Sequence, residues 1–169
     1  TLLLTTLAVV AVILIVVYRS PVLWIIPLLS SLFALSTAGG IVYLLAKNDI
    51  IDVDGQSQGI LSVLVIGAAT DYALLLIARY REELHHHESR FDAMRAAYKG
   101  VWEPILASGS TVSISLLILL FSQLTNTAGL GPVGAIGIVC SMITILTLLP
   151  ALLPVSYTHL RAHETPEHL

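Results

Sequence analysis

Long apolar runs separated by short polar breaks dominate this chain. A helix needs roughly 20 mostly apolar residues to cross a hydrocarbon core of about 30 Å, and runs of this length are far too long for the strands of a membrane barrel. The pattern therefore predicts an all-α membrane protein with five transmembrane helices. We place them at about residues 1–17, 22–46, 58–78, 104–122 and 130–153.

The breaks between these runs have the composition of turns and loops. Residues 18–21 read "YRSP", residues 47–59 are acidic and glycine-containing, and residues 123–132 are polar. If the helices alternate in direction, most of the basic residues fall on one side of the membrane, which the positive-inside rule predicts to be cytoplasmic. These residues are Arg19, Arg79, Arg81, Arg90, Arg95 and Lys99.

A short interfacial helix is predicted near residues 88–99, between the third and fourth spans. Ser89 and Asp92 resemble a capping box, and Gly100 suits a helix stop. Three apolar side chains share one face, which we expect to lie on the cytoplasmic membrane surface. They are Phe91, Met94 and Tyr98. A solvated connector is the alternative interpretation of this segment.

Composition supports a membrane protein. Of the 169 residues, 56% are hydrophobic and 11% are charged, and the mean hydropathy of +0.90 is too high for an ordinary soluble domain of this size. The net charge of −3 says little about partners, and the basic footprint of a nucleic-acid-binding protein is absent. The single cysteine, Cys140, lies in an apolar run and is interpreted as a packing residue.

Both ends of the chain are unusual. The sequence opens with "TLLLTTLAVV", inside a hydrophobic segment and without an initiator Met or a basic flank, so we expect it to be a piece of a longer protein. Residues 155–169 lack periodicity and hold three of the six histidines. We expect this tail to be non-native, and we assign the membrane domain to residues 1–154.

Asp71 is the only Asp, Glu, Lys, Arg or His inside the five predicted spans. A charged carboxylate costs roughly 2.5 to 3.5 kcal/mol at the centre of a membrane helix, so such a residue usually faces a bundle interior and marks an ion or proton pathway. Desolvation favours the neutral carboxyl group, and no Lys or Arg in the spans compensates its charge. We therefore expect Asp71 to bind and release a proton. The alternative role is a structural hydrogen bond between helices.

The neighbours of Asp71 indicate where its partners lie. Tyr72 follows directly and points about 100° away, so the two side chains address different partners. Gly67 and Ala68 are small, which allows another helix to come close at this depth.

The fourth predicted span carries a stripe of hydroxyl groups at i, i+3 and i+7. Such a stripe can support a proton relay by hydrogen bonding a carboxyl group or holding waters. In the alternative interpretation, each hydroxyl group bonds the carbonyl one turn back in its own helix. The stripe consists of Ser108, Thr111 and Ser115.

Other chemistries have weaker support in the sequence. The histidine run at 85–87 fans out around a helix and lacks a recognised zinc spacing, so we predict no metal site. Intramembrane aspartyl proteolysis needs a second carboxylate in the spans, and Asp71 is the only one in the predicted spans. The glycine-rich segment 129–137 follows no strand and precedes no Lys, so it is not a nucleotide loop. We interpret Gly134, Gly137 and Ser141 as a small packing face, and we predict no cofactor and no catalytic residue.

Three segments together resemble the MMPL branch of the resistance-nodulation-division superfamily of membrane transporters. They read "GAATDYALLLIARYREEL" at 67–84, "ILASGSTVSISLLILL" at 105–120 and "GLGPVGAIGIVCSMITILTLLPALL" at 129–153. The resemblance covers about residues 1–154. It implies that the five spans are the second to sixth helices of one six-helix repeat, most like the N-terminal one, in a multi-pass protein of the bacterial plasma membrane.

The resemblance also implies a function. In such transporters the Asp-Tyr pair, here Asp71 and Tyr72, forms a proton relay with a matching pair in a second transmembrane repeat. The relay drives export of a lipid or another hydrophobic cargo. The implied partners are therefore membrane lipids, that cargo and the second repeat, which is absent from this chain.

Two other functions are compatible with the same predicted helices. A protein-export accessory subunit of the same superfamily also uses a membrane carboxylate, but its cargo is a translocating polypeptide. A non-transporting scaffold or sensor, similar to sterol-sensing domains, would use Asp71 only as a structural residue.

Overall fold

The computed structural model describes residues 2–18, 25–121 and 125–161, all at the backbone level. Side chains at 17–18, 125–128 and 156–161 are outside the description. The described parts form five α-helices and a 3₁₀ turn, and they contain no strand. The elements are α1 (Leu2–Tyr18), α2 (Ile25–Lys47), α3 (Gly55–Glu83), α4 (Arg90–Leu117), η1 (Ile118–Phe121) and α5 (Thr125–Arg161). The prediction of an all-α fold with five helices is confirmed.

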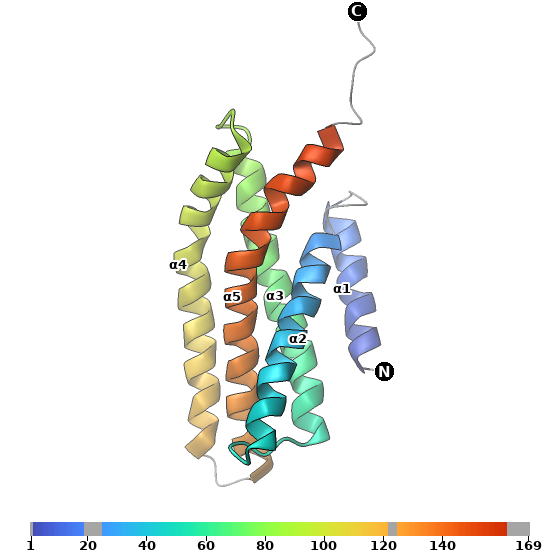
Figure 1. The fold of residues 1–169 in the computed structure, drawn as a ribbon, viewed down its shortest axis with the longest axis vertical. Helices are drawn as coiled ribbons and strands as arrows, with labels where there is room; N and C mark the ends of the chain where they lie inside the picture. Colours follow the sequence, from blue (N-terminus) through green and yellow to red (C-terminus); the bar gives the residue numbers. More distant parts are fainter. Residues whose placement is uncertain (1, 19–24, 122–124, 162–169) are drawn as a thin grey trace, which may run out of the picture.

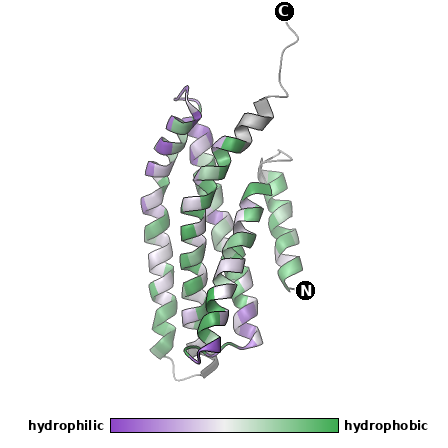
Figure 2. Ribbon diagram, in the orientation of Figure 1, coloured by the Kyte–Doolittle hydropathy of each residue, from purple (hydrophilic) through white to green (hydrophobic). Residues whose placement is uncertain are grey.

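The helices run alternately up and down in one elongated bundle (Figure 1). Helices α3 and α5 lie at its centre, because α5 contacts α2, α3 and α4, and α3 contacts all four other helices. Among the described elements, α1 touches only α2 and α3 and therefore lies at the edge. Apolar residues fill the middle of the bundle, and hydrophilic residues gather at its two ends (Figure 2).

Four helices are long and apolar enough to cross a membrane. These candidate spans are Ile25–Lys47, Gly55–Glu83, Arg90–Phe121 and Gly129–Val155, and α1 is a shorter apolar helix. The chain is therefore a multi-pass membrane protein. The spans in α3 and α4 begin before their predicted boundaries, and α3 also ends later, because these helices continue past the hydrocarbon-length core into the polar ends. The spans in α2 and α5 agree with the predicted boundaries to within three residues.

The predicted separate interfacial helix near 88–99 is wrong. Residues from Arg90 onward are the first turns of α4, which continues unbroken to Leu117 and contains Pro104. The residues of the predicted apolar face do not share one environment. Met94 is 5% exposed and lies inside the bundle, whereas Phe91 is 74% exposed and lies outside it. Gly100 does not end the helix but lies against α3, where a Cβ would come within 3.2 Å of the Arg79 side chain. Tertiary packing therefore overrides the local stop signal.

Close helix crossings depend on glycines in α4 and α5. A Cβ on Gly131 would lie 2.5 Å from the carbonyl oxygen of Leu116, and one on Gly137 would lie 2.7 Å from Val65. A Cβ on Gly109 would collide with the side chain of Met142. These contacts bring α5 against both α3 and α4, and they confirm Gly137 as part of a packing face.

Ser141 extends the same face of α5. It is fully buried, and its hydroxyl group donates to the carbonyl oxygen of Gly137 at 2.8 Å. It also lies 3.4 Å from the carbonyl oxygen of Val65 on α3. Gly134 completes the predicted small face, because a Cβ there would meet Leu116 at 3.0 Å.

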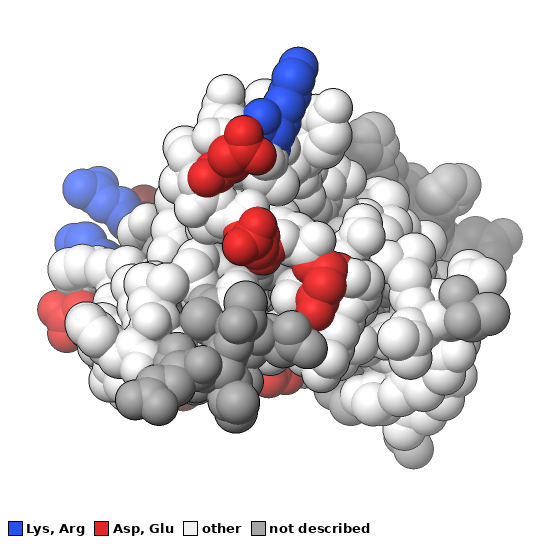
Figure 3. Space-filling view, turned by 90° about the horizontal axis from the view of Figure 1, so that it is seen from below, with Lys and Arg blue, Asp and Glu red and all other residues white. Residues whose placement is uncertain are grey.

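The two ends of the bundle differ in charge. Arg79, Arg81, Arg90, Arg95 and Lys99 all lie at the end where α3 joins α4. Lys47 and three aspartates lie at the opposite end, where acidic side chains appear in the view from below (Figure 3). The alternating topology behind the predicted charge asymmetry is therefore present. Arg19 lies outside the described residues.

Asp54 caps the N-terminus of α3 at the acidic end. Its carboxylate accepts a hydrogen bond from the backbone N–H of Ser57 at 2.7 Å. Hydrogen bonds from the Ser57 side chain and backbone hold the pKa of Asp54 below its ordinary value of 3.8. A side-chain acceptor at this position satisfies one of the free N–H groups of the first helical turn.

Replacing Asp54 with Ala is expected to fray the first turn of α3, which faster amide hydrogen exchange at Ser57 would report. Because folding lowers the pKa of Asp54, the cap stabilises the helix above pH 3.8 and is lost as the pH falls through the lower folded value. Asp54→Asn keeps an acceptor oxygen and is the matched control. Unchanged exchange in Asp54→Ala would show that the cap does not hold this turn.

The end of α5 bears on the predicted tail. The helix continues to Arg161, and residues 162–169 lie outside the description. The prediction that residues 155–169 are non-native stays a prediction.

Candidate functional site

Asp71 lies on the outer face of α3, inside its membrane-spanning part. It is exposed at the surface of this chain and is eight residues from Arg79, or about 12 Å along the helix axis. The same face of α3 carries exposed apolar side chains at helical spacing, each more than 40% exposed. They are Ile60, Val63 and Leu75. The carboxyl group is therefore surrounded by apolar surface and points away from the core of this bundle.

Tyr72 has the opposite environment. Its side chain is only 8% exposed and belongs to the hydrophobic core. Its hydroxyl group lies near the Ser108 side chain, so α3 and α4 bring polar groups close together at this depth. The expectation that Asp71 and Tyr72 face different directions agrees with this geometry.

The hydroxyl stripe on α4 divides into two parts. Ser108 lies near the Tyr72 hydroxyl group. Thr111 donates to the carbonyl oxygen of Ala107 and Ser115 donates to that of Thr111, each at 2.8 Å. All three stripe residues are exposed on the surface of this chain. The local hydrogen bonds of the alternative interpretation are thus present at two positions, whereas Ser108 lies near Tyr72.

Gly67 and Ala68 lie one turn before Asp71. A Cβ built on Gly67 would meet nothing within 4 Å, so no described helix approaches it closely. Ala68 is partly buried and packs against the core. The predicted close packing at Gly67 has no partner within the described residues, and it stays a prediction about a helix from outside them.

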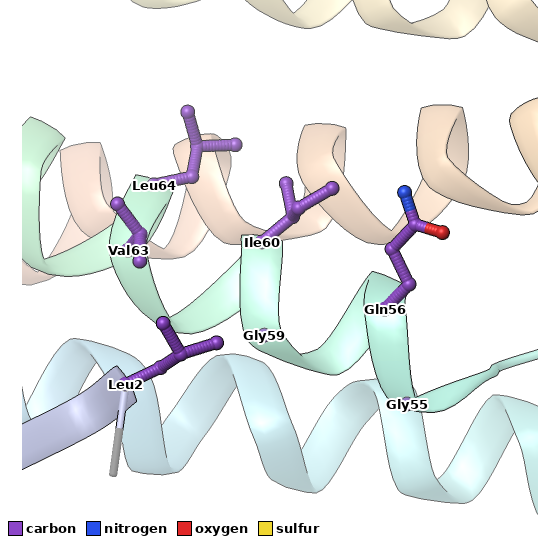
Figure 4. Close-up of a pocket in the computed structure, with 7 residues that line it drawn as sticks. All are labelled: Leu2, Gly55, Gln56, Gly59, Ile60, Val63 and Leu64. Carbon is purple, nitrogen blue, oxygen red and sulfur yellow. The ribbon is translucent and has the colours of Figure 1, made fainter.

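An apolar pocket of about 430 Å³ lies further along the face of α3 that carries Asp71, near the acidic end. Leu2 of α1 closes one side of it, and the first turns of α3 form the other (Figure 4). Ile60 and Val63 line the pocket and belong to the same exposed face as Asp71. The sequence pattern did not reveal this pocket, because it depends on the crossing of α1 over α3.

The histidine side chains that follow α3 contact backbone carbonyl oxygens one turn earlier in the chain. The Nδ1 atoms of His85 and His86 lie 2.8 and 3.1 Å from the carbonyl oxygens of Arg81 and Glu82. Within the described ranges, no three His, Cys, Asp or Glu side chains are grouped closely enough to hold a metal ion. The predictions of no metal and no cofactor stay predictions.

Comparison with known proteins gives the family. The sequence model of the MMPL family matches residues 1–158. A Streptomyces coelicolor protein named as a membrane protein, SCO0839, is 60% identical over 144 residues, which are 85% of this chain and 20% of that protein. The apo-petrobactin exporter of Bacillus anthracis is 39% identical over 152 residues, covering 90% of this chain and 20% of the exporter.

A further relative comes from Mycobacterium tuberculosis. It is named as a probable transport protein, MmpL12, and is 36% identical over 144 residues, covering 85% of this chain and 12% of that protein. The chain thus spans about a fifth of the length of the first relatives it matches. Since the family model covers nearly the whole chain, this five-helix membrane chain belongs to the MMPL family.

Proposed function

We propose that this chain is part of an exporter driven by the proton-motive force, in which Asp71 and Tyr72 belong to a proton relay. The observation that carries the proposal is the placement of Asp71 on the membrane-spanning face of α3. The residue is exposed on its own chain, and space beside it at Gly67 is open. A lone carboxyl group facing lipid is costly, so this face is suited to a second helical unit that covers it.

The covering unit is the second transmembrane repeat of the parent protein. The open surface at Gly67 allows close approach of a helix, and the apolar residues on the same face supply packing area. A relay partner on that repeat would then share the proton with Asp71. Membrane lipids cover the remaining apolar surface.

Tyr72 and Ser108 give the relay a link to α4. When Asp71 changes its charge, the preferred arrangement of the neighbouring polar groups changes. Ser108 lies near Tyr72, and a hydrogen bond between them would connect that change to α4. Each proton that crosses 100 mV releases about 2.3 kcal/mol, which is available to drive helix movement and transport. Thr111 and Ser115 are local contributors to the polarity of α4.

Export is the activity that the relatives' names favour. One relative is named an exporter and another a probable transport protein. We propose a lipid or another hydrophobic molecule as the cargo and the bacterial plasma membrane as the location. The direct test is Asp71→Asn in the parent protein, followed by measurement of proton-gradient-dependent export in vesicles.

The proposed Tyr72–Ser108 hydrogen bond is testable by a double-mutant cycle. Tyr72→Phe and Ser108→Ala are each expected to lower the export rate, and the double mutant is expected to be no worse than the more affected single mutant. A hydrogen bond of this kind contributes about 0.5 to 1.5 kcal/mol, which is the coupling energy expected in the cycle of unfolding free energies. Ser110→Ala, at an exposed neighbouring hydroxyl group, is the control. Fully additive effects would contradict a functional bond.

A further inference from the structure

One face of α4 combines basic and aromatic side chains at the end of the bundle. Its members are spaced at i, i+4, i+8, i+11 and i+15, so they share one side of the helix. They are Phe91, Arg95, Lys99, Trp102 and Leu106, and each is exposed. The opposite side of the same turns is buried in the bundle at Ala93, Met94, Ala97 and Val101. This exposed set is called the α4 basic face below.

The order of these residues matches the layers of a bilayer. Glu103 is the last charged residue before Phe121, and the 18 residues from 104 to 121 span about 27 Å as a helix, close to the thickness of the hydrocarbon core. Trp102, 39% exposed, lies just outside this stretch, where aromatic rings favour the headgroup region. Lys99 and Arg95 follow about 5 and 10 Å further out.

Among the described residues, the two cations of the α4 basic face have no ion-pair partner. At this end of the bundle, Arg79 pairs with Glu82 at 2.7 Å and with Glu83 at 2.9 Å. Across the described ranges, no ion pair includes Arg95 or Lys99. Asp92 and Glu103 are acidic neighbours one turn away, and neither forms an ion pair with them.

We propose that the α4 basic face binds the headgroup of an anionic phospholipid. Arg95 and Lys99 hold its phosphate from one side of the helix, since both side chains are long enough to reach a common phosphate group. Trp102 packs at the boundary between the headgroup and the acyl chains of the lipid, and Leu106 contacts an acyl chain below that boundary. Charge complementarity favours an anionic lipid, because a zwitterionic headgroup brings its own cation beside these two.

The side of the membrane on which the α4 basic face lies also favours an anionic phospholipid. The basic residues lie at the end that the positive-inside rule places in the cytoplasm, and the cytoplasmic leaflet carries the negative surface potential of anionic lipids. Each basic residue near such a surface strengthens binding about fivefold, so two residues account for about a 30-fold preference. The site lies outside the Asp71 face and does not depend on the proton relay.

The test is lipid binding by the whole parent protein. Phosphatidylglycerol is titrated into protein purified in zwitterionic micelles, and the apparent affinity is read from the rise in melting temperature. Arg95→Gln/Lys99→Gln is expected to bind about 30-fold more weakly than wild type at low salt. Binding to wild type is expected to weaken as salt is added, because these charges are exposed. Lys99→Arg is expected to keep the affinity.

Arg81→Gln is the matched control, because Arg81 is exposed at the same end of the bundle but lies on α3. An equal loss of affinity in Arg81→Gln would overturn the proposal, since it would show a response to total charge alone. The proposal would also be overturned if phosphatidylcholine stabilised the wild type as strongly as phosphatidylglycerol does. It would likewise be overturned if inorganic phosphate displaced the lipid. Trp102→Leu, which leaves the charges in place, is expected to weaken phosphatidylglycerol binding. No change would exclude the proposed boundary contact.

Discussion

Asp71→Asn is expected to lower the rate of proton-gradient-dependent export by the parent protein at least tenfold, which corresponds to about 1.4 kcal/mol or more of activation free energy. Asparagine has nearly the shape of the carboxyl group but cannot take up and release a proton. Because Asp71 is exposed on the outer face of α3 and belongs to no described hydrophobic cluster, the substitution is not expected to unfold the bundle. Export of the proposed cargo is measured in vesicles with an imposed proton gradient.

Two further variants make the result specific. Asp52→Asn removes an exposed carboxylate from the loop between α2 and α3 and is expected to leave export unchanged. Asp71→Glu keeps a titratable group and is expected to retain more activity than Asp71→Asn. If folded Asp71→Asn exports at the wild-type rate, Asp71 is a structural polar residue and the proposed relay is wrong.

Gly131→Ala is expected to destabilise the bundle by about 1 to 3 kcal/mol, the usual cost of overpacking a close contact. The added Cβ would lie 2.5 Å from the backbone carbonyl oxygen of Leu116 and 3.3 Å from the Cβ of Leu119. Neither atom is the end of a flexible side chain, so relief requires that α5 move away from the end of α4. The free energy of unfolding in mixed micelles would report the loss.

Gly40→Ala is the matched control for this substitution. Gly40 also lies inside a membrane helix, but a Cβ there meets nothing within 4 Å. Ala is favoured over Gly in a helix interior by up to about 1 kcal/mol, so this variant is expected to be neutral or slightly more stable. A destabilised Gly40→Ala would point to a general intolerance of larger residues, and an unchanged Gly131→Ala would contradict the close crossing.

The sequence determined the class of fold and the location of the unusual charge. Helices and closed barrels satisfy their backbone within lipid, and the apolar runs are too long for barrel strands, so the runs specified the helices with little help from tertiary contacts. Asp71 stood out for the same reason, because a carboxylate in an apolar run is visible without a structure. Helical geometry also predicted that Asp71 and Tyr72 diverge, and one is exposed while the other is buried.

The tertiary structure decided what the local signals could not. Gly100 suited a helix stop, yet it packs against Arg79 within an unbroken α4. The α4 hydroxyl stripe looked uniform in the sequence, yet Thr111 and Ser115 bond carbonyl oxygens of their own helix while Ser108 lies near Tyr72. Both outcomes depend on which helices meet and at what depth. That choice is made by contacts between residues far apart in the chain, which periodicity along one helix does not encode.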